Sequence, residues 1–469
     1  MELITDILLL AAALFIVVIG VVVAAIPVVY VKDKLSSNSI HRNYPVLGHA
    51  RYILKELGVF LRSYFFAADR EELPFNRFQR DYVNNMADNK GGVIAFGSSY
   101  DGGISFANSP YPKLDEDVLH VKTVVFGPDV KYPYATDSYF NISGTSYGSM
   151  SGAAIEALSA GARMAGAWHN TGEGGFSPYH KAGGGDTVFQ IGTANYGVRN
   201  KDGSLSYNKL TELAKNPQIK MFEIKLSQGA KPGKGGILPG VKVTETIAET
   251  RGIPMGEDSI SPNRRTDVSN ADELCSLIDR VKSATGKPVG IKFVLGTRQD
   301  LVDMLNAFVK RDIYPSFITL DSADGGTGAA PAALMDHVGM CIKESLPILM
   351  AQLRQQGLDS KILVCTSGKL ITPADIAWAL AQGAVAVNTA RGPMFALGCI
   401  QALQCDKNTC PTGITTQNKK LVKGLKPDVK SVRVANYLTN TKKQVGYIAH
   451  STGANCARSI DPERVTRND

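Results

Sequence analysis

The feature that most constrains the fold is a series of eight short apolar runs. Each run ends in Gly, Asn, Asp or Thr residues, and amphipathic stretches separate most of them. Strands that alternate with helices, and carry their polar residues at the strand ends, are typical of a (β/α)8 TIM barrel with its active site at the C-terminal face. The runs are residues 141–148, 162–175, 188–197, 221–233, 288–296, 316–328, 361–368 and 384–392.

Three of the intervening stretches are clear helix candidates: "ADELCSLIDRVKSAT" (271–285), "RQDLVDMLNAFVKRD" (298–312) and "PADIAWALAQG" (373–383). A further apolar run, "TVVFG" (123–127), is a possible lead-in before the eight. A doubly wound open sheet is the alternative arrangement. No G-x-G-x-x-G follows an early strand, and this disfavours it.

The N-terminal segment indicates a membrane anchor. Residues 7–31 carry no charge, and as a helix they would extend roughly 37 Å, enough for a tilted crossing. A cleaved signal peptide is disfavoured, because no Lys or Arg precedes the run and the run is long. Basic residues follow it, so the positive-inside rule predicts a single-pass protein with its N-terminus outside and its catalytic domain cytoplasmic. Stretches such as "RYILKELGVFLRSYFF" (51–66) and "FNRFQRDYVNNMA" (75–87) favour helices after the anchor.

Three cysteines lie within "CIQALQCDKNTCPTG" (399–413) at the spacing C-x5-C-x4-C. A reducing cytoplasm disfavours disulfides. Soft thiolates select iron–sulfur clusters or zinc, but structural zinc needs a fourth ligand, and neither His nor Cys occurs in the thirty residues after Cys410. Two alternatives stay open: three merely buried cysteines, and a four-iron cube completed by Cys456. We interpret the remaining cysteines as core or incidental residues: Cys275, Cys341, Cys365 and Cys456.

Two glycine loops follow the last two predicted strands, in "TSGKLITPADIAWAL" (366–380) and "NTARGPMFALG" (388–398). Paired loops at this place are the usual phosphate site of such barrels, since backbone N–H groups and a helix N-terminus face the anion. Arg391 adds a charged donor. The formal net charge of +8 includes no long basic run, which argues against a nucleic-acid partner.

Four strings carry a family resemblance: "NTGEGG" (170–175), "QGAKPGKGGILPG" (228–240), "DGGTGA" (324–329) and "ALGCIQALQCDKNTCPTGITTQ" (396–417). In this order they resemble the FMN-binding domain of the glutamate synthase large subunit, over about residues 140–417. The chain is more closely similar to short glutamate-synthase-like proteins that carry this domain behind a hydrophobic N-terminus. We therefore expect a transmembrane anchor (1–31), a helical N-terminal region (32–114), an FMN-binding barrel with an Fe–S loop (115–440) and a C-terminal tail (441–469).

The resemblance implies where the cofactors bind. The FMN phosphate would lie at Gly368, Arg391 and Gly392, and the thiolates of Cys399, Cys405 and Cys410 would hold a 3Fe–4S cluster. We expect Cys399 near the middle of the helix that starts after Arg391, and Cys405 at its end. The other flavin contacts expected are Gly144, Thr145, Ser146, Gln190 and Lys292.

The resemblance also implies an activity: an oxidoreductase acting on CH–NH2 donors, in which hydride from FMN N5 reduces the imine of 2-oxoglutarate and the cluster delivers single electrons. Lys292 would stabilise the reduced flavin, although a solvated Lys is the alternative. Glu173 and Asp324 are the acidic candidates for catalysis, although each is also suited to capping a turn. The nitrogen donor would be ammonia, an amine or a partner subunit. The electron donor would be a ferredoxin, a reductase subunit or the membrane.

One position departs from the family pattern in the substrate loop. Lys231 and Arg251 match a Lys and an Arg that bind 2-oxoglutarate, but Ile237 stands where the family has Gln. Loss of such an amide costs about 1–3 kcal/mol, so glutamate as the product is in doubt and a related acid is possible. Two other functions stay open: an FMN-barrel oxidoreductase on a different small acid, and a non-catalytic electron-transfer or scaffold subunit.

Overall fold

The computed structural model describes residues 2–36, 38–98, 103–117 and 121–468. The chain divides into two compact units, residues 1–78 and 79–469. Each is described by itself.

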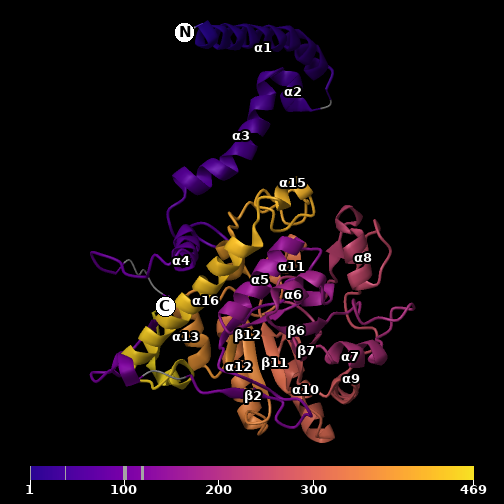
Figure 1. Cartoon of the computed structure of the whole chain (residues 1–469), viewed down its shortest axis with the longest axis vertical. Coiled ribbons are helices and arrows are strands. Elements are labelled where there is room, and N and C mark those ends of the chain that lie inside the picture. Colours follow the sequence, from indigo (N-terminus) through magenta and orange to yellow (C-terminus); the bar gives the residue numbers. More distant parts are fainter. Residues whose placement is uncertain (1, 37, 99–102, 118–120, 469) are drawn as a thin grey trace. The chain divides into compact units, whose positions relative to one another are not determined.

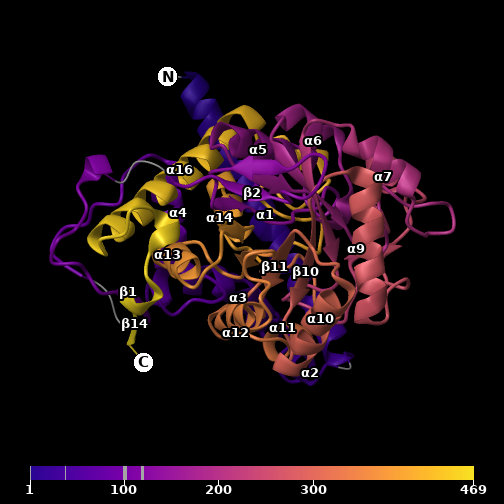
Figure 2. The same cartoon turned by 90° about the horizontal axis from the view of Figure 1, so that it is seen from below.

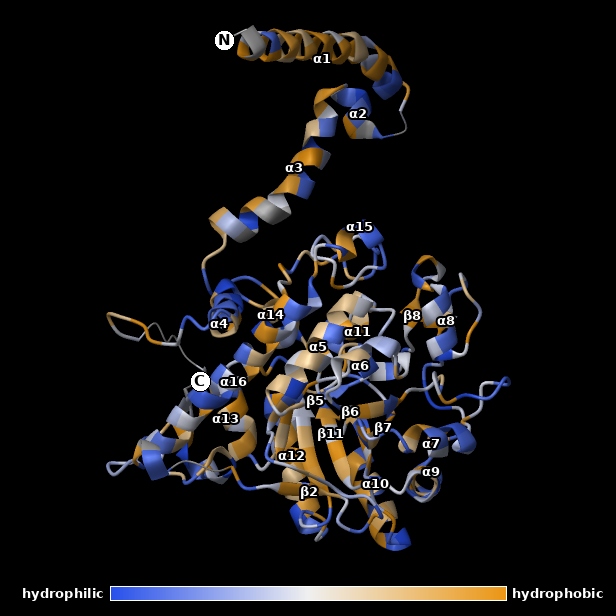
Figure 3. Ribbon diagram, in the orientation of Figure 1, coloured by the Kyte–Doolittle hydropathy of each residue, from blue (hydrophilic) through white to orange (hydrophobic). Residues whose placement is uncertain are grey.

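The first unit begins with one long apolar helix. Helix α1 (Glu2–Lys34) is hydrophobic along most of its length (Figure 3) and its apolar side chains are exposed. In the part of the chain that the structure describes, it is the one helix long and apolar enough to cross a membrane, a criterion that a signal sequence also meets. Helices α2 (Ser39–Asn43) and α3 (Leu47–Leu61) follow, and a π-helical turn, Arg62–Phe66, ends the run. The helix expected over 51–66 is confirmed.

The second unit is built on a closed barrel of eight parallel strands (Figures 1 and 2). Each predicted apolar run contains one of these strands, so the TIM-barrel prediction is confirmed and the open sheet is excluded. Around the barrel the strands lie in the order β4, β5, β6, β7, β10, β11, β12, β13, and β13 pairs with β4. They are β4 (Phe140–Ile142), β5 (Trp168–Asn170), β6 (Asp186–Ile191), β7 (Ile219–Lys225), β10 (Val289–Val294), β11 (Phe317–Asp321), β12 (Leu363–Ser367) and β13 (Ala386–Thr389).

Helices surround the barrel (Figure 2). The three predicted helices are confirmed as α9, α10 and α13. Each begins at a side-chain cap: Asn270, Thr297 and Thr372 accept hydrogen bonds from backbone N–H groups of the first turn. The full set is α5 (Gly152–Met164), α6 (Pro178–Gly183), α7 (Tyr207–Ala214), α8 (Glu245–Arg251), α9 (Ala271–Thr285), α10 (Arg298–Arg311), α11 (Ala332–His337), α12 (Ile342–Gln355), α13 (Pro373–Ala381) and α14 (Arg391–Leu397).

A short hairpin closes the N-terminal end of the barrel. Strand β2 (Val124–Phe126), which is the "TVVFG" lead-in, pairs antiparallel with β3 (Tyr134–Thr136). The Phe126 ring packs edge-on against Trp168 at 5.7 Å and Phe317 at 5.5 Å. Because the hairpin and these rings fill this end, a ligand has room only at the opposite, C-terminal face.

The remaining elements pack against the barrel or its loops. Helix α16 (Pro427–Ser451) continues through residue 440, where we expected the tail to begin, and its Asn436 and Asn440 donate hydrogen bonds to carbonyls of the α4 end. Strand β1 lies in the region expected to be helical and pairs with the last strand, β14. The other bounds are α4 (Arg77–Ala87), β1 (Gly103–Phe106), β8 (Ile237–Leu238), β9 (Ser259–Ile260), α15 (Lys419–Val422) and β14 (Val465–Asn468). The 3-10 turns are Asp115–Asp117, Gly172–Gly174, Gly240–Lys242, Ala457–Ser459 and Pro462–Arg464.

Candidate active site

A buried glutamate connects four strands inside the barrel. Glu223 of β7 accepts hydrogen bonds from Asn170 Nδ2 at 2.8 Å, Gln190 Nε2 at 2.7 Å and Thr319 Oγ1 at 2.6 Å. The Glu223 side chain is 1% exposed. The three donors therefore fix the orientation of the Glu223 side chain. Gln190, an expected flavin contact, is therefore held rigidly at the barrel interior.

Lys292 forms a buried ion pair with the neighbouring strand. Its Nζ lies 3.3 Å from Asp321 Oδ2. Burial acts to lower the pKa of Lys292, but Asp321 and Glu223 outweigh it and raise that pKa above its usual value. Lys292 is thus a buried, charged residue, and the solvated alternative is excluded. Asp321 is held in turn by Ser367 Oγ at 2.7 Å and by the N–H of Gly229 at 3.1 Å.

The expected flavin loop after β4 packs against the ends of β5 and β6. Thr145 Oγ1 lies 2.6 Å from His169 Nε2, and the Thr145 N–H donates to the Asn170 carbonyl. Burial lowers the pKa of His169 to about 3, so the ring is neutral. A side chain at Gly144 would contact Asn170 and Gln190, and one at Gly172 would contact Ser146. The structure therefore brings Gly144, Thr145, Ser146 and Gln190 together at one edge of the barrel mouth.

Three cations surround Glu173. Lys225 Nζ lies 3.2 Å from Glu173 Oε2. Burial acts to raise the pKa of Glu173, but Lys225, Arg251 and Lys231 outweigh it and lower that pKa. The substrate-binding candidates Lys231 and Arg251 thus lie in one group with the catalytic candidate Glu173. After Glu173 is paired with Lys225, the two other cations give the group a surplus of positive charge.

Arg251 is almost fully buried and partly unused. Its guanidinium donates to Ser259 Oγ at 3.2 Å and to the Tyr147 carbonyl at 3.0 Å, and it lies over the Tyr196 ring at 5.1 Å. Its Nε is buried and has no hydrogen-bond partner among the described residues. An unpaired buried donor is costly, so the Arg251 Nε is an unsatisfied polar atom within this group.

The substrate-loop position that departs from the family pattern adjoins this buried group, since a Cβ added at Gly236, the residue before it, would meet Glu173 Oε1 at 2.3 Å. Ile237 begins strand β8, pairs with Ile260 of β9, and is 48% exposed.

Asp324 has a defined structural role. Its Oδ2 accepts the Ile342 N–H at 2.7 Å and the Ser322 hydroxyl at 3.3 Å. Ile342 begins α12, so the carboxylate caps that helix, which is the alternative weighed for it above. Gly368 lies close by with φ of +133°, and a Cβ there would meet Ser322 Oγ at 1.9 Å. The loops after β11 and β12 therefore contact each other at Gly368, where there is no room for a side chain.

Arg391 brings the loop after β13 to the same place. Arg391 is the first residue of α14, and its Nη2 donates to the Thr327 carbonyl at 2.9 Å. A Cβ added at Gly326 would lie 3.0 Å from the same Nη2 atom. Gly392 has a different reason to be glycine, because a Cβ would lie 2.2 Å from the Tyr437 hydroxyl of α16. The loops after β11 and β13 thus meet at one guanidinium, and Gly392 lets α14 pack on α16.

The positions expected for two cysteines were wrong. Helix α14 ends at Leu397 and Gly398 caps it with φ of +108°, so Cys399 follows the helix and Cys405 lies well beyond it. The early end has a local cause, since Gly398 adopts the left-handed conformation that terminates helices. Three non-glycine residues of the loop that follows also have positive φ: Gln401, Leu403 and Asn408.

The cysteine loop contains one activated thiol. Burial acts to raise the pKa of Cys410, but hydrogen bonds from Thr412 and Thr415 outweigh it and lower the pKa to about 7. The loop is fixed by Lys242 Nζ, which donates to the carbonyls of Cys405 at 3.3 Å and Thr415 at 3.0 Å. A Cβ at Gly328 would be 3.9 Å from Cys405 Cβ, so the cysteine loop adjoins the loop after β11.

The thiols lie far enough apart to distinguish two kinds of metal site. Among described residues, the trio is not a group with all donor atoms within 4.8 Å. A single zinc with Zn–S bonds of about 2.3 Å would hold its thiolates within about 4.6 Å of one another. In this structure the three thiols are therefore not arranged around a single zinc ion.

Cys456 lies at the opposite end of the barrel. Arg458, two residues on, donates to the carbonyls of Ser138 and Val385, which precede β4 and β13. The cysteine trio follows the C-terminal end of β13. Cys456 is therefore not placed to act as their fourth ligand.

Sequence reasoning missed four charged residues of the site: Glu223, Lys225, Asp321 and Lys242. A signal was present for the first three, since they stand within or at the end of the apolar strands "IKMFEIK" and "FITLD". A charged residue in a strand that is buried on both faces needs a partner inside the barrel. No sequence pattern indicated Lys242, because its carbonyl partners come from loops distant in the chain.

The comparisons identify similar proteins. Residues 113–455 match the family model described as the conserved region in glutamate synthase. The chain is 38% identical to the glutamate synthase large subunit-like protein YerD of Bacillus subtilis, covering 97% of this chain and 95% of that one. It is 35% identical to the archaeal-type glutamate synthase [NADPH] of Thermotoga neapolitana, over 68% of this chain and 60% of that one.

A solved structure supports the fold alone. A glycine-to-alanine mutant of an active chimera of (S)-mandelate dehydrogenase superposes with a TM-score of 0.50 at 14% identity. The match covers 84% of this chain and 100% of that one.

Proposed function

The chain belongs to the glutamate synthase family, and from that premise we propose that it is an FMN-dependent oxidoreductase acting on a small acidic oxo acid and a nitrogen donor. Its substrate is 2-oxoglutarate or a close relative, and its reaction is reductive amination. The observation that carries the proposal is the positive surplus beside the barrel mouth. Lys231 and Arg251 remain after Lys225 has neutralised Glu173. Two cations match the charge of a dicarboxylate.

The residues at the barrel mouth fit FMN. The loops at Gly326 and Gly368 offer bare backbone, and Arg391 lies against the first of them, which together make an anion cradle for the phosphate. On the other side, Gln190 and the charged Lys292 face the barrel interior, as a flavin ring requires. When bound, FMN supplies the hydride. Lys292 holds positive charge at the place where the reduced ring becomes negative.

Glu173 is the carboxylate that we propose to accept a proton during the amination, since it is ionised and has no proton to donate. Its carboxylate lies among the cations that would bind the acid, and Lys225 keeps it ionised. Asp324 caps α12 at the same face of the barrel. We therefore propose that it supports the loop after β11 and takes no part in proton transfer.

Cys399, Cys405 and Cys410 fit an iron–sulfur cluster, and we propose a 3Fe–4S cluster. The donor set is three soft thiols on one loop, one of them with a pKa of about 7, and Cys456 lies at the far end of the barrel. When bound, the cluster supplies single electrons. The electrons come from a one-electron carrier such as a ferredoxin or from a reductase subunit, and the nitrogen comes from ammonia or an amine donor.

A different acid is the second candidate, favoured by the observation at Ile237. The apolar side chain there is 48% exposed and offers no amide to a keto acid. The test applies to both candidates. Flavin in the purified protein is reduced chemically under anaerobic conditions, and a panel of oxo acids with ammonia is added. Reoxidation by 2-oxoglutarate plus ammonia supports the first candidate, and reoxidation by another acid alone supports the second. Reoxidation by none supports a non-catalytic electron-transfer or scaffold subunit.

We propose that α1 is a retained single-pass anchor with the barrel on the cytoplasmic side. The candidate span is Ile4–Lys34, and Lys32 and Lys34 stand at its C-terminal end. Membranes washed with alkaline carbonate should keep the full-length chain. External protease should leave the barrel intact in spheroplasts, whereas release of a shortened chain would identify α1 as a signal sequence.

A further inference from the structure

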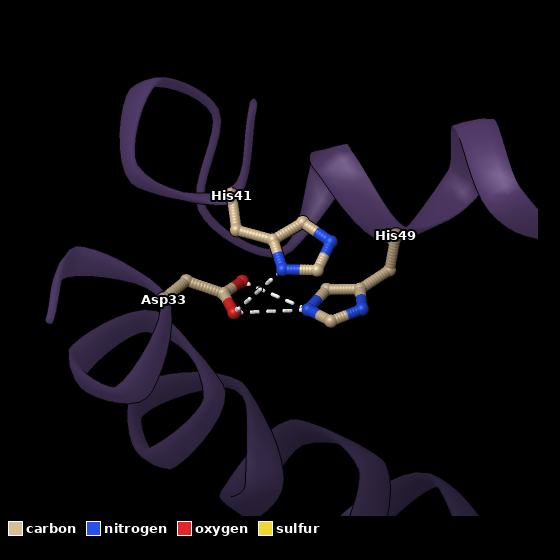
Figure 4. Close-up of side chains that lie close together, drawn as sticks. All are labelled: Asp33, His41 and His49. Carbon is tan, nitrogen blue, oxygen red and sulfur yellow. Dashed lines mark hydrogen bonds and ion pairs between the residues drawn. The ribbon is translucent and has the colours of Figure 1, made fainter. Parts of the chain in front are cut away.

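We propose that Asp33, His41 and His49 form a binding site for a divalent transition-metal ion of the Zn2+ type. The three residues are spaced D-x7-H-x7-H and come from three successive helices, α1, α2 and α3. Figure 4 shows both imidazole rings turned toward the Asp33 carboxylate. In the part of the chain that the structure describes, theirs is the group of three metal-type side chains whose donor atoms all lie within 4.8 Å of one another.

The distances fit one shared ion. His49 Nε2 lies 3.0 Å from each Asp33 oxygen, and His41 Nδ1 lies 3.9 Å from Asp33 Oδ1. A tetrahedral ion with bonds of about 2.0–2.2 Å would place its ligand atoms roughly 3.3–3.6 Å apart. Shifts of a few tenths of an ångström therefore convert the observed arrangement into a metal centre.

The carboxylate is short of positive charge. Asp33 is 2% exposed, and its partners are the Val46 N–H at 2.8 Å and the two histidines. No Lys or Arg pairs with it among the described contacts. It also lies in the last turn of α1, where the helix dipole disfavours an anion. A buried carboxylate is stabilised by a nearby cation, and a divalent ion held by the two imidazoles would supply one.

His41 provides a second, independent observation. Its Nδ1 is beyond hydrogen-bond distance of Asp33, and its Nε2 is buried without a partner among the described residues. The ring stacks on His49 with centroids 4.1 Å apart, so the two imidazoles hold each other in place beside the carboxylate. A metal ion on Nδ1 explains why this imidazole is held here without a hydrogen bond of its own.

The donor set selects the kind of ion. Two imidazoles and one carboxylate are a ligand set for Zn2+ and similar transition ions, whereas Mg2+ and Ca2+ prefer oxygen ligands. His49 is 44% exposed in its side chain, so a fourth position is open to water. The ion would fasten the end of α1 to α2 and α3 and so fix the direction in which the chain leaves the apolar helix.

The test uses the full-length protein in detergent, with its cofactors in place. Titration with Zn2+ should show one ion bound per chain in the wild type. The variants His41→Ala and His49→Ala should bind this ion much more weakly. Each should weaken affinity by more than about 100-fold, because loss of even an outer-shell partner costs 10- to 100-fold. His337→Ala, an exposed histidine of α11, is the control and should bind as the wild type does.

Four further measurements guard against misfolding and against binding at the cysteines. Asp33→His should restore affinity relative to Asp33→Ala, since a third imidazole replaces the carboxylate. Bound Co2+ should lack thiolate charge-transfer absorption, and iron content should be equal in all variants. Trypsin cleavage after Arg42 should slow with Zn2+ in the wild type alone. Equal Zn2+ binding by the wild type and the His41→Ala/His49→Ala double variant, or no binding by the wild type, would overturn the proposal.

Discussion

Lys292 Nζ and Asp321 Oδ2 lie 3.3 Å apart, on adjacent strands and both buried. Removing one partner leaves an uncompensated charge inside the barrel. We predict that Lys292→Met destabilises the barrel by about 3–5 kcal/mol, and that adding Asp321→Asn restores part of the loss. The chain's two tryptophans, Trp168 and Trp378, are both buried in the barrel unit, so their fluorescence follows its unfolding in urea. Equal stability of wild type and Lys292→Met would contradict the pair.

The same pair predicts a pH dependence. The pKa of Asp321 is lowered in the fold, so its contribution is present above the unfolded pKa of about 3.9 and is lost as pH falls through the folded value. The pKa of Lys292 is raised, so its contribution is present below about 10.4 and is lost only at higher pH. Stability should therefore fall more steeply below about pH 5 in the wild type than in the Lys292→Met/Asp321→Asn variant. Parallel urea midpoints from pH 7 to pH 3.5 would refute this.

Glu223 should be replaceable by Gln but not by Ala. Glu223→Ala leaves three buried donors without an acceptor, and each unpaired donor costs about 1–3 kcal/mol of stability. In Glu223→Gln the new NH2 can donate to the Thr319 hydroxyl, so the network survives. Adding Thr319→Val to Glu223→Gln removes that acceptor and should lower the urea midpoint well below that of either single variant. Additive effects of the two substitutions would show that the side chains are not coupled.

The barrel was predictable from sequence because each strand carries its own signal. That signal is an apolar run followed by Gly and polar residues, and it can be recognised from neighbouring residues alone. Capping residues such as Thr372 likewise mark where helices begin. The pairing of β1 with β14 was not predictable. It joins residues more than 350 positions apart, and such partners are chosen by tertiary packing, not by local pattern.

The site was predicted as a set of motifs but not as a network. Lys231, Arg251 and Glu173 were identified from family strings, yet their relationship depends on Lys225, which only the folded strand places beside Glu173. The end of α14 was misjudged for a similar reason. Cys399 is expected near the middle of this helix, whereas the left-handed conformation of Gly398 ends the helix before Cys399.

Arg391→Ala should weaken FMN retention more than Lys369→Ala does. Arg391 presents a planar donor fork where the loops after β11 and β13 meet, and a charge-assisted contact is worth roughly 1.5–3 kcal/mol, or about 10- to 150-fold in affinity. Arg391→Lys should fall between wild type and Arg391→Ala. FMN is measured by fluorescence after dialysis. Similar losses at positions 369 and 391 would mean that the phosphate lies elsewhere.

Ile237→Gln should improve use of 2-oxoglutarate if this position contacts the substrate. The side chain is exposed, so stability should not change, and the regained hydrogen bond is worth about 1–3 kcal/mol in KM. Its register partner Ile260, 64% exposed, supplies the matched control, Ile260→Gln. Reoxidation of the reduced protein over a range of 2-oxoglutarate concentrations gives the comparison. If both variants behave alike, the acid does not reach β8.

The cysteine loop yields the most specific prediction. Changing Cys399, Cys405 or Cys410 to Ser should abolish the iron signal, leave the flavin bound and stop reduction by a one-electron donor. The flavin is retained because its proposed contacts lie on other loops, at Gly368 and Arg391. Cys456→Ser should change none of these properties, since Cys456 lies at the opposite end of the barrel.

Anaerobic iron and sulfide analysis with EPR of the oxidised protein distinguishes the possible clusters. A 3Fe–4S cluster is paramagnetic when oxidised, whereas a cubic cluster in its usual 2+ state is silent. Three thiolates on one loop suffice for the former, and Cys456 lies at the opposite end of the barrel. Silence with four irons per chain, or zinc in place of iron, would show that the loop recruits another ligand and would refute the three-iron assignment.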